Sequence, residues 1–216
     1  RVLIENAGLA SAGAIHRYVY SRDMGNRVFI LLGSGNNSAD GLVAAKHLNQ
    51  WGYLVIVYCC TSNQPGFGDL FPSGEVPFKV ILANQDSSGE ELDRQLTATD
   101  IVIDAVFGTG LNRPISEPIR TILNQVNCVR TAANRPRLLA IDVPSGVDSG
   151  TGDTDPATVP MDGTITLGNP KIGLFLGPAS SVVGEIIPVN IGFPEELPIK
   201  INKEMLTPEW ARTHLP

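Results

Sequence analysis

The chain has 216 residues and a net charge of −6, and it is 43% hydrophobic and 18% charged. This length suits one globular domain, and the composition excludes a disordered or fibrous chain. The absence of any Lys/Arg cluster argues against binding to nucleic acid or to an anionic membrane. No run approaches the roughly 20 apolar residues of a membrane span. We expect a cytoplasmic protein, although Arg1 in place of methionine leaves open a targeting segment ahead of it.

Short runs rich in β-branched residues recur along the chain and predict strands at 28–32, 54–58, 78–82, 101–107, 138–143, 164–167 and 186–191. Several are apolar on both faces, which is typical of a sheet covered by helices on both sides. Helical patterns lie at 1–21, 38–51, 90–98 and 118–126. The segment 148–162 is rich in Gly, Asp, Thr and Pro and predicts a loop. This alternation predicts an α/β fold: a three-layer αβα sandwich with a mostly parallel central sheet.

The segment 33–41 follows a predicted strand and opens a predicted helix, where backbone N–H groups and the helix dipole can hold a phosphate. Ser38 stands where a dinucleotide fingerprint has its third glycine. The second strand leads into 59–63, which contains no acidic residue for a ribose hydroxyl. A Walker loop is absent as well. An NAD-dependent oxidoreductase is therefore disfavoured, and a tight turn used only for packing stays an alternative.

Asp104 lies inside an apolar strand, where a carboxylate is costly to bury without a cation or several donors. Gly108, Thr109 and Gly110 follow it and can offer N–H groups to an anion. Arg113 either adds a positive charge to that site or lies on the surface. We therefore expect Asp104 to have a partner, with an anion-binding loop close by.

Asp142 ends a second apolar strand, near the carboxyl edge at which parallel strands build binding crevices, and it is our acid/base candidate. Ser145 is not an obvious nucleophile because no GxSxG is present. Hydrolase chemistry also lacks a well-placed histidine, since predicted helices or the tail contain His16, His47 and His214.

Lys171 lies in a predicted loop, where a lone lysine is usually solvated. The cysteines are three in number and lack CxxC spacing, which favours neither a disulfide framework nor a zinc site. We expect all three to pack as small apolar residues: Cys59, Cys60 and Cys128.

Taken together, these segments resemble the YjeF N-terminal domain family, the NAD(P)H-hydrate epimerases. The resemblance runs over most of the chain and rests on an Asn-Ala-Gly opening at 6–8 and on the segments 35–41, 104–111, 141–146 and 170–171. It implies a Rossmann-like αβα fold. It also implies that residues 1–197 form the epimerase domain and that 198–216 form a tail or linker toward a dehydratase domain that this chain lacks.

The resemblance implies substrate contacts from Asp142 and from two loops, formed by Asn36, Asn37, Ser38, Ala39, Asp40, Gly108, Thr109, Gly110, Leu111, Asn112, Arg113 and Pro114. It implies catalytic roles for Asp142 and Lys171 and a potassium ion bound by Asn37, Asp104 and Ser145. Oxygen ligands suit such a hard cation, which would give Asp104 its partner. One departure matters. The family reads Asn-Asn-Gly-Gly-Asp, so Ser38 and Ala39 are expected to crowd the ligand or to require an unfavourable φ.

The implied activity is epimerisation of R- and S-NADHX and NADPHX, the hydrated forms of NADH and NADPH, with Asp142 as acid and base. The implied partners are that small-molecule substrate, an NAD(P)H-hydrate dehydratase that is fused or separate, and a second copy in a homodimer. The alternative is a non-catalytic scaffold like the YjeF-type domains of enhancer-of-decapping proteins. The change at Ser38 and Ala39 fits the scaffold, whereas Asp104, Asp142 and Lys171 favour the enzyme.

Overall fold

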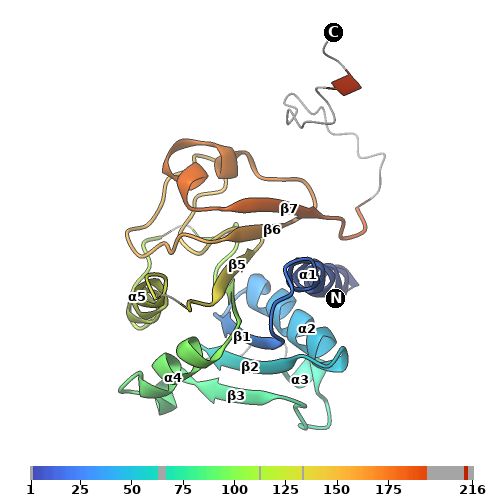
Figure 1. Cartoon of the computed structure of the whole chain (residues 1–216), viewed down its shortest axis with the longest axis vertical. Helices are drawn as coiled ribbons and strands as arrows, with labels where there is room; N and C mark the ends of the chain where they lie inside the picture. The colour runs from blue at the N-terminus through green and yellow to red at the C-terminus, as the bar shows by residue number, and fades with distance from the viewer. Residues whose placement is uncertain (1, 63–66, 112, 133, 194–211, 214–216) are drawn as a thin grey trace.

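A single sheet of seven strands organises the chain, in the order β3-β2-β1-β4-β5-β6-β7, with every neighbouring pair parallel (Figure 1). The computed structural model describes residues 2–62, 67–111, 113–132, 134–193 and 212–213. The strands are β1 Arg27–Leu32, β2 Leu54–Cys59, β3 Lys79–Leu82, β4 Ile101–Ala105, β5 Arg137–Ile141, β6 Gly163–Leu167 and β7 Glu185–Val189. The chain adds strands outward from β1 to β3 and then returns to place β4 beside β1. This reversal creates a switch point, where such sheets open a crevice beyond the carboxyl ends of the strands.

Helices cover both faces of the sheet (Figure 1). On one face α1 (Val2–Tyr20) and α2 (Asn36–Gln50) pack with one side of the strands in a shared apolar core. On the other face α4 (Glu90–Ala98) and α5 (Ile119–Val129) pack in a second core. The short helix α3 (Phe67–Leu70) packs against the first core. The predicted αβα sandwich is confirmed, and the strands lie at the seven predicted places.

The β6–β7 part of the sheet is covered differently. The chain segment that connects β6 to β7 contains two 3₁₀ helices, η2 (Ile172–Phe175) and η3 (Gly177–Ser181), and a small apolar cluster packs beneath them. The cluster joins them to the loop after β5 through Val143, Val147, Leu174, Ala179 and Val183. A further 3₁₀ turn, η1, spans Ala83–Gln85.

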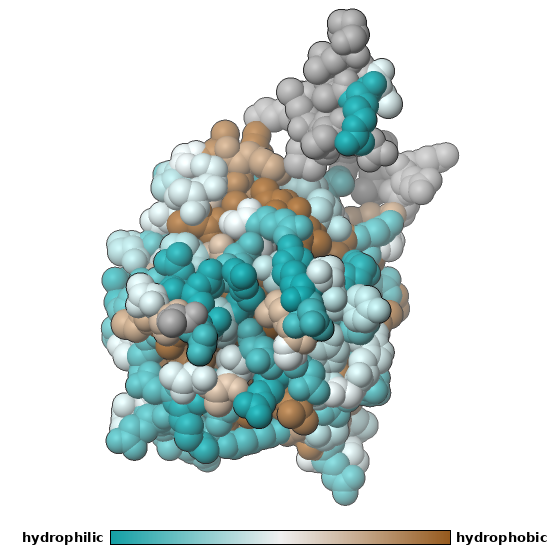
Figure 2. All heavy atoms as spheres, viewed as in Figure 1, coloured by the Kyte–Doolittle hydropathy of each residue, from teal (hydrophilic) through white to brown (hydrophobic). Residues whose placement is uncertain are grey.

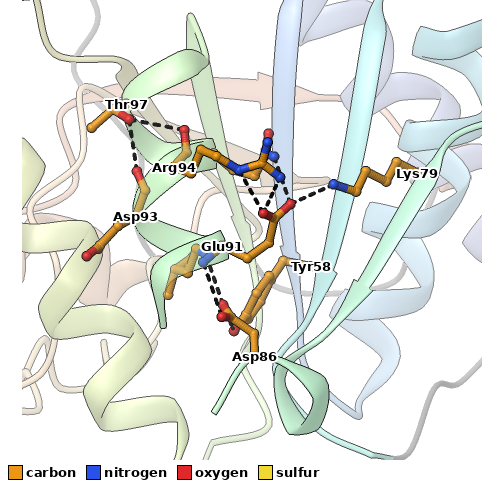
Figure 3. A network of polar contacts seen from close by, with 9 residues as sticks. Tyr58, Lys79, Asp86, Glu91, Asp93, Arg94 and Thr97 are labelled. Atoms are coloured by element: carbon orange, nitrogen blue, oxygen red, sulfur yellow. Dashed lines mark hydrogen bonds and ion pairs between the residues drawn. The ribbon is translucent and has the colours of Figure 1, made fainter. Parts of the chain in front are cut away.

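A polar network fixes α4 to the β2–β3 edge of the sheet (Figure 3). Asp86 accepts hydrogen bonds from the backbone N–H groups of Glu91 (3.1 Å) and Leu92 (2.9 Å) at the start of the helix, and from the Tyr58 hydroxyl (3.3 Å). The Glu91 carboxylate in turn pairs with Lys79 of β3 at 2.6 Å. A carboxylate at a helix N-terminus satisfies donors that the helix itself leaves unpaired. The network therefore locks the register of α4 on its side of the sheet.

Two sequence expectations need correction. Three strands end two residues before their predicted limits, at Ala105, Ile141 and Val189, and at the first two the chain turns into a site loop. Cys59 and Cys60 are buried as expected, but the expectation for Cys128 is wrong, since it lies exposed on α5. The predicted boundary after residue 197 and the tail 198–216 fall outside the described residues, except for 212–213. Among the described helices, none combines the length and apolar character needed to cross a membrane.

Candidate functional site

A cavity of about 870 Å³ opens at the carboxyl edge of the sheet, beside the switch point. Segments that follow β1, β4, β5 and β6 line it. Most of the predicted site residues meet there, namely Asn36, Asn37, Asp40, Gly108, Thr109, Gly110, Leu111, Arg113, Asp142 and Lys171. The predicted contacts Ser38, Ala39 and Pro114 are not among its lining residues, and Asn112 lies outside the described residues.

The loop between β1 and α2 presents the start of a helix to this cavity. Ser34, Gly35 and Asn36 are exposed there, and the first turn of α2 contains no acidic residue. Gly33 permits the close approach of this loop to β4, because a Cβ atom at that position would lie 2.4 Å from the Val106 carbonyl oxygen. The partial positive charge of a helix N-terminus suits an anion such as a phosphate group.

Ser38 and Ala39 fit the first turn of α2 without the unfavourable φ that was one of the two effects expected of them. Neither adopts a positive φ, so the expected backbone strain is wrong. Ser38 is buried beneath the loop, where its hydroxyl donates to the Ala105 carbonyl at 3.0 Å. The serine thus ties the first turn of α2 to the end of β4 instead of reaching into the cavity.

The carboxyl group of Asp104 is buried. It accepts two hydrogen bonds from Ser145, from the hydroxyl at 2.6 Å and the backbone N–H at 2.8 Å, and a third from the Val106 N–H at 3.1 Å. Burial raises the pKa of Asp104, and these hydrogen bonds act to lower it. The sequence predicted a partner for Asp104, and Ser145 and Val106 provide it with three hydrogen-bond donors.

The same region has an unsatisfied oxygen. The amide nitrogen of Asn37 donates to the carbonyl oxygens of Phe107 (3.0 Å) and Ile141 (3.1 Å), which joins the loops after β4 and β5. Its Oδ1 atom is buried and has no hydrogen-bond partner among the described residues. The Ser145 hydroxyl meanwhile accepts the Phe107 N–H at 2.9 Å. A buried amide oxygen without a donor, near a buried carboxylate, fits an oxygen-ligated monovalent cation.

Asp142 and Lys171 form an ion pair across the cavity wall. Lys171 Nζ lies 2.5 Å from Asp142 Oδ1, and the other carboxylate oxygen accepts the Thr109 N–H at 3.2 Å. Asp142 has a φ of +70°, which is uncommon for a residue other than glycine and fixes the direction of its side chain. A Cβ atom on Gly108 would lie 2.8 Å from Asp142 Oδ2, so this approach depends on that glycine.

Asp40 is a second carboxyl group on the same cavity. It is 8% exposed, and no hydrogen bond or ion pair joins it to another described residue. Burial, and to a smaller extent the charge of Asp142, raise the pKa of Asp40 to about 7. The resemblance implies a substrate contact for Asp40, and its raised pKa means that this carboxyl group changes protonation state near neutral pH.

Sequence reasoning missed the apolar side of the cavity. Leu3, Ile4 and Ala7 of α1 line it, together with Ile191 and Phe193 from the segment after β7. The three α1 residues share one helical face, but nothing in their spacing distinguishes a cavity wall from ordinary core. The pairing of Lys171 with Asp142 was equally hidden, because it depends on how the β6 loop folds back.

Comparison with known proteins assigns the family. Residues 1–173 match the family described as YjeF-related protein N-terminus. The chain belongs to this family. An NAD(P)H-hydrate epimerase of Rhodopirellula baltica is 32% identical over 197 residues, a region that covers 91% of this chain and 77% of that protein.

A longer relative and a solved structure are also similar to this chain. The bifunctional NAD(P)H-hydrate repair enzyme Nnr of Moorella thermoacetica is 33% identical over all of this chain, which spans 41% of that protein. The crystal structure of yeast ynu0, YNL200c, has a TM-score of 0.69 and 25% identity, and the match covers 87% of this chain and 77% of the yeast chain. The Rossmann-like α/β architecture therefore agrees with that of this solved yeast protein.

Proposed function

We propose that this domain epimerises NAD(P)H hydrate, interconverting its R and S forms. The observation that carries the proposal is the Asp142–Lys171 ion pair, 2.5 Å long, on a cavity that also contains an open helix N-terminus. The cavity thus offers a group that moves protons and a place for phosphate oxygens. The names of the Rhodopirellula and Moorella relatives support the same activity.

The reaction requires the protein to transfer protons and to position the substrate. The hydrated ring carries a hydroxyl group on a carbon bonded to nitrogen, so breaking and remaking one bond to that carbon inverts it. Asp142 accepts a proton in one step and returns it in the other, whether the path is loss of water or ring opening. Lys171 holds the carboxylate in place and keeps its charge balanced. Binding of the distant phosphates at the start of α2 positions the ring.

A potassium ion fits this proposal as a support of the loops. Asn37, Asp104 and Ser145 would hold it, since Asn37 Oδ1 has no donor among the described residues and Asp104 is a buried carboxyl group in contact with Ser145. When bound, such an ion supplies positive charge that offsets the buried carboxylate and fixes the loops after β4 and β5. We propose the same partners for the domain: an NAD(P)H-hydrate dehydratase, fused or separate, and a second copy of the chain in a homodimer.

The test is the rate at which pure R-NADHX converts to the S form, measured against the spontaneous rate. We expect the chain to accelerate this conversion. A non-catalytic scaffold predicts no acceleration at any protein concentration, and that result would overturn the proposal. Addition of potassium, with lithium at equal ionic strength as a control, tests the cation separately.

A further inference from the structure

One side of the cavity is apolar and partly open. We call it the α1–β7 wall and define it as Leu3, Ile4, Ala7, Ile191 and Phe193. Leu3 is 47% exposed and Phe193 is 45% exposed, although both line the cavity. Figure 2 shows hydrophobic residues gathered over the β6–β7 half of the visible face, with mostly hydrophilic residues below them. Apolar side chains exposed on a cavity with a few convergent polar groups are typical of a binding subsite.

The wall is held in place before any ligand arrives. The Asn6 side chain donates to the Ile191 carbonyl oxygen at 3.1 Å, which ties α1 to the segment after β7. Gly192 adopts a φ of +89° beside this contact, and a Cβ atom there would lie 2.9 Å from Asn6 Nδ2. On the other side of α1, a Cβ atom on Gly8 would lie 2.3 Å from the Val43 side chain of α2. Tight packing on both sides makes the wall rigid.

The order of the strands decides which part of a dinucleotide reaches the wall. The phosphate-binding helix start follows β1 and the Gly108 loop follows β4, while Asp142 follows β5, the next strand along. Leu167 ends β6, and the wall residue Ile191 follows β7. A ligand with phosphates over β1 and β4 and its reacting carbon at Asp142 therefore extends its ring toward β6 and the wall. Its adenosine half points the other way.

We propose that the α1–β7 wall is the subsite for the hydrated nicotinamide ring and that the adenosine half of the substrate lies outside it. This inference rests on the proposed epimerase function and adds the direction in which the substrate binds. It follows that one phosphate and the ring are sufficient for reaction. The hydrate of reduced nicotinamide mononucleotide is then a substrate as well.

The experiment compares Leu3→Ser with Leu9→Ser, using NADHX and the hydrated mononucleotide as substrates. Leu9 is a matched control, because it is 43% exposed on the same helix and does not line this cavity. We expect the parent chain to epimerise both substrates. Leu3→Ser should raise KM for both substrates by the same factor, about tenfold, because both lose the apolar contact between Leu3 and the nicotinamide ring. Leu9→Ser should leave both KM values unchanged, and Phe193→Ser should repeat the effect of Leu3→Ser.

Four outcomes contradict the inference. If Leu3→Ser raises KM for NADHX alone, the wall holds adenine and the binding direction is reversed. If the parent turns over NADHX but not the mononucleotide, or if neither wall variant changes KM, the ring subsite is wrong while the epimerase function stands. If the parent accelerates neither substrate, the proposed function fails and the inference fails with it.

Discussion

Lys171 Nζ lies 2.5 Å from Asp142 Oδ1, and the same ammonium group donates to the Leu167 carbonyl oxygen at 2.7 Å. The lysine is thus anchored to the end of β6, while the aspartate stands at the end of β5. Two neighbouring strands hold the two charges in contact at the cavity. This pairing converts a loop lysine, unremarkable by its position in the chain, into part of the candidate active site.

Asp142→Asn should lower the rate of NADHX epimerisation by about 100-fold or more while substrate affinity changes little. Asparagine keeps the size of the side chain and tolerates a positive φ, but it does not exchange protons at neutral pH. Single-turnover kinetics and equilibrium binding measure the two effects separately. Asp153→Asn, at an exposed position, is the control. A variant as fast as an active parent would remove Asp142 from the chemistry.

Asp40→Asn should stabilise the fold at pH 8 and leave its stability nearly unchanged at pH 3. The pKa of Asp40 rises from 3.8 to about 7, so the folded state retains a proton that the unfolded chain releases between those values. Stability conferred by this proton is present at low pH and is lost as the pH rises through that interval, by up to about 4 kcal/mol. Urea denaturation at the two pH values measures it. The control is Asp23→Asn at an exposed position, which should change the free energy of unfolding equally at both pH values. If Asp40→Asn also changes it equally at both, this account is wrong.

Asp104→Asn should lower the free energy of unfolding by about 1–3 kcal/mol, since an amide cannot accept all three hydrogen bonds from Ser145 and Val106. If a cation site is present, potassium should raise the melting temperature of the parent chain more than lithium does. The variant should lose that difference. Thermal melts in the two chloride salts at equal ionic strength provide the measurement. If the variant keeps both the stability and the potassium effect of the parent, the cation site is misassigned.

Replacing Ser38 and Ala39 together by glycines should destabilise the fold by about 2–3 kcal/mol. The reasons are the lost hydrogen bond to Ala105 and the greater freedom of glycine in a helix. Affinity for NADHX should stay within about twofold, because neither residue lines the cavity. Chemical denaturation and equilibrium binding test the two halves. A large loss of affinity would mean that Ser38 makes an essential contact with the substrate.

The architecture was largely predictable because it depends on local patterns. The β-branched runs around Ile30, Val57 and Ile103 alternate with helical segments, and this alternation admits few folds other than a parallel sheet with two helical layers. Two buried acidic residues were equally recognisable from the sequence. Asp104 and Asp142 stood out because a carboxylate in an apolar strand needs a reason to be there.

The features of the site that the sequence did not predict depend on contacts between distant segments. Asn6 meets the Ile191 carbonyl across 185 positions in sequence, and no local pattern signals such a contact. Lys171 reaches Asp142 only because the loop after β6 folds back over the sheet edge. The direction of the Ser38 side chain was misjudged for a similar reason, since the acceptor that buries it belongs to β4.

The left-handed backbone of Asp142 limits the residues that could replace it without disturbing the fold. At a φ of +70° a β-branched or bulky replacement would strain the turn after β5, whereas asparagine and glycine adopt that conformation readily. Few residues other than aspartate, asparagine and glycine therefore fit this position without strain, so most substitutions of Asp142 remove the carboxyl group and disturb the turn together.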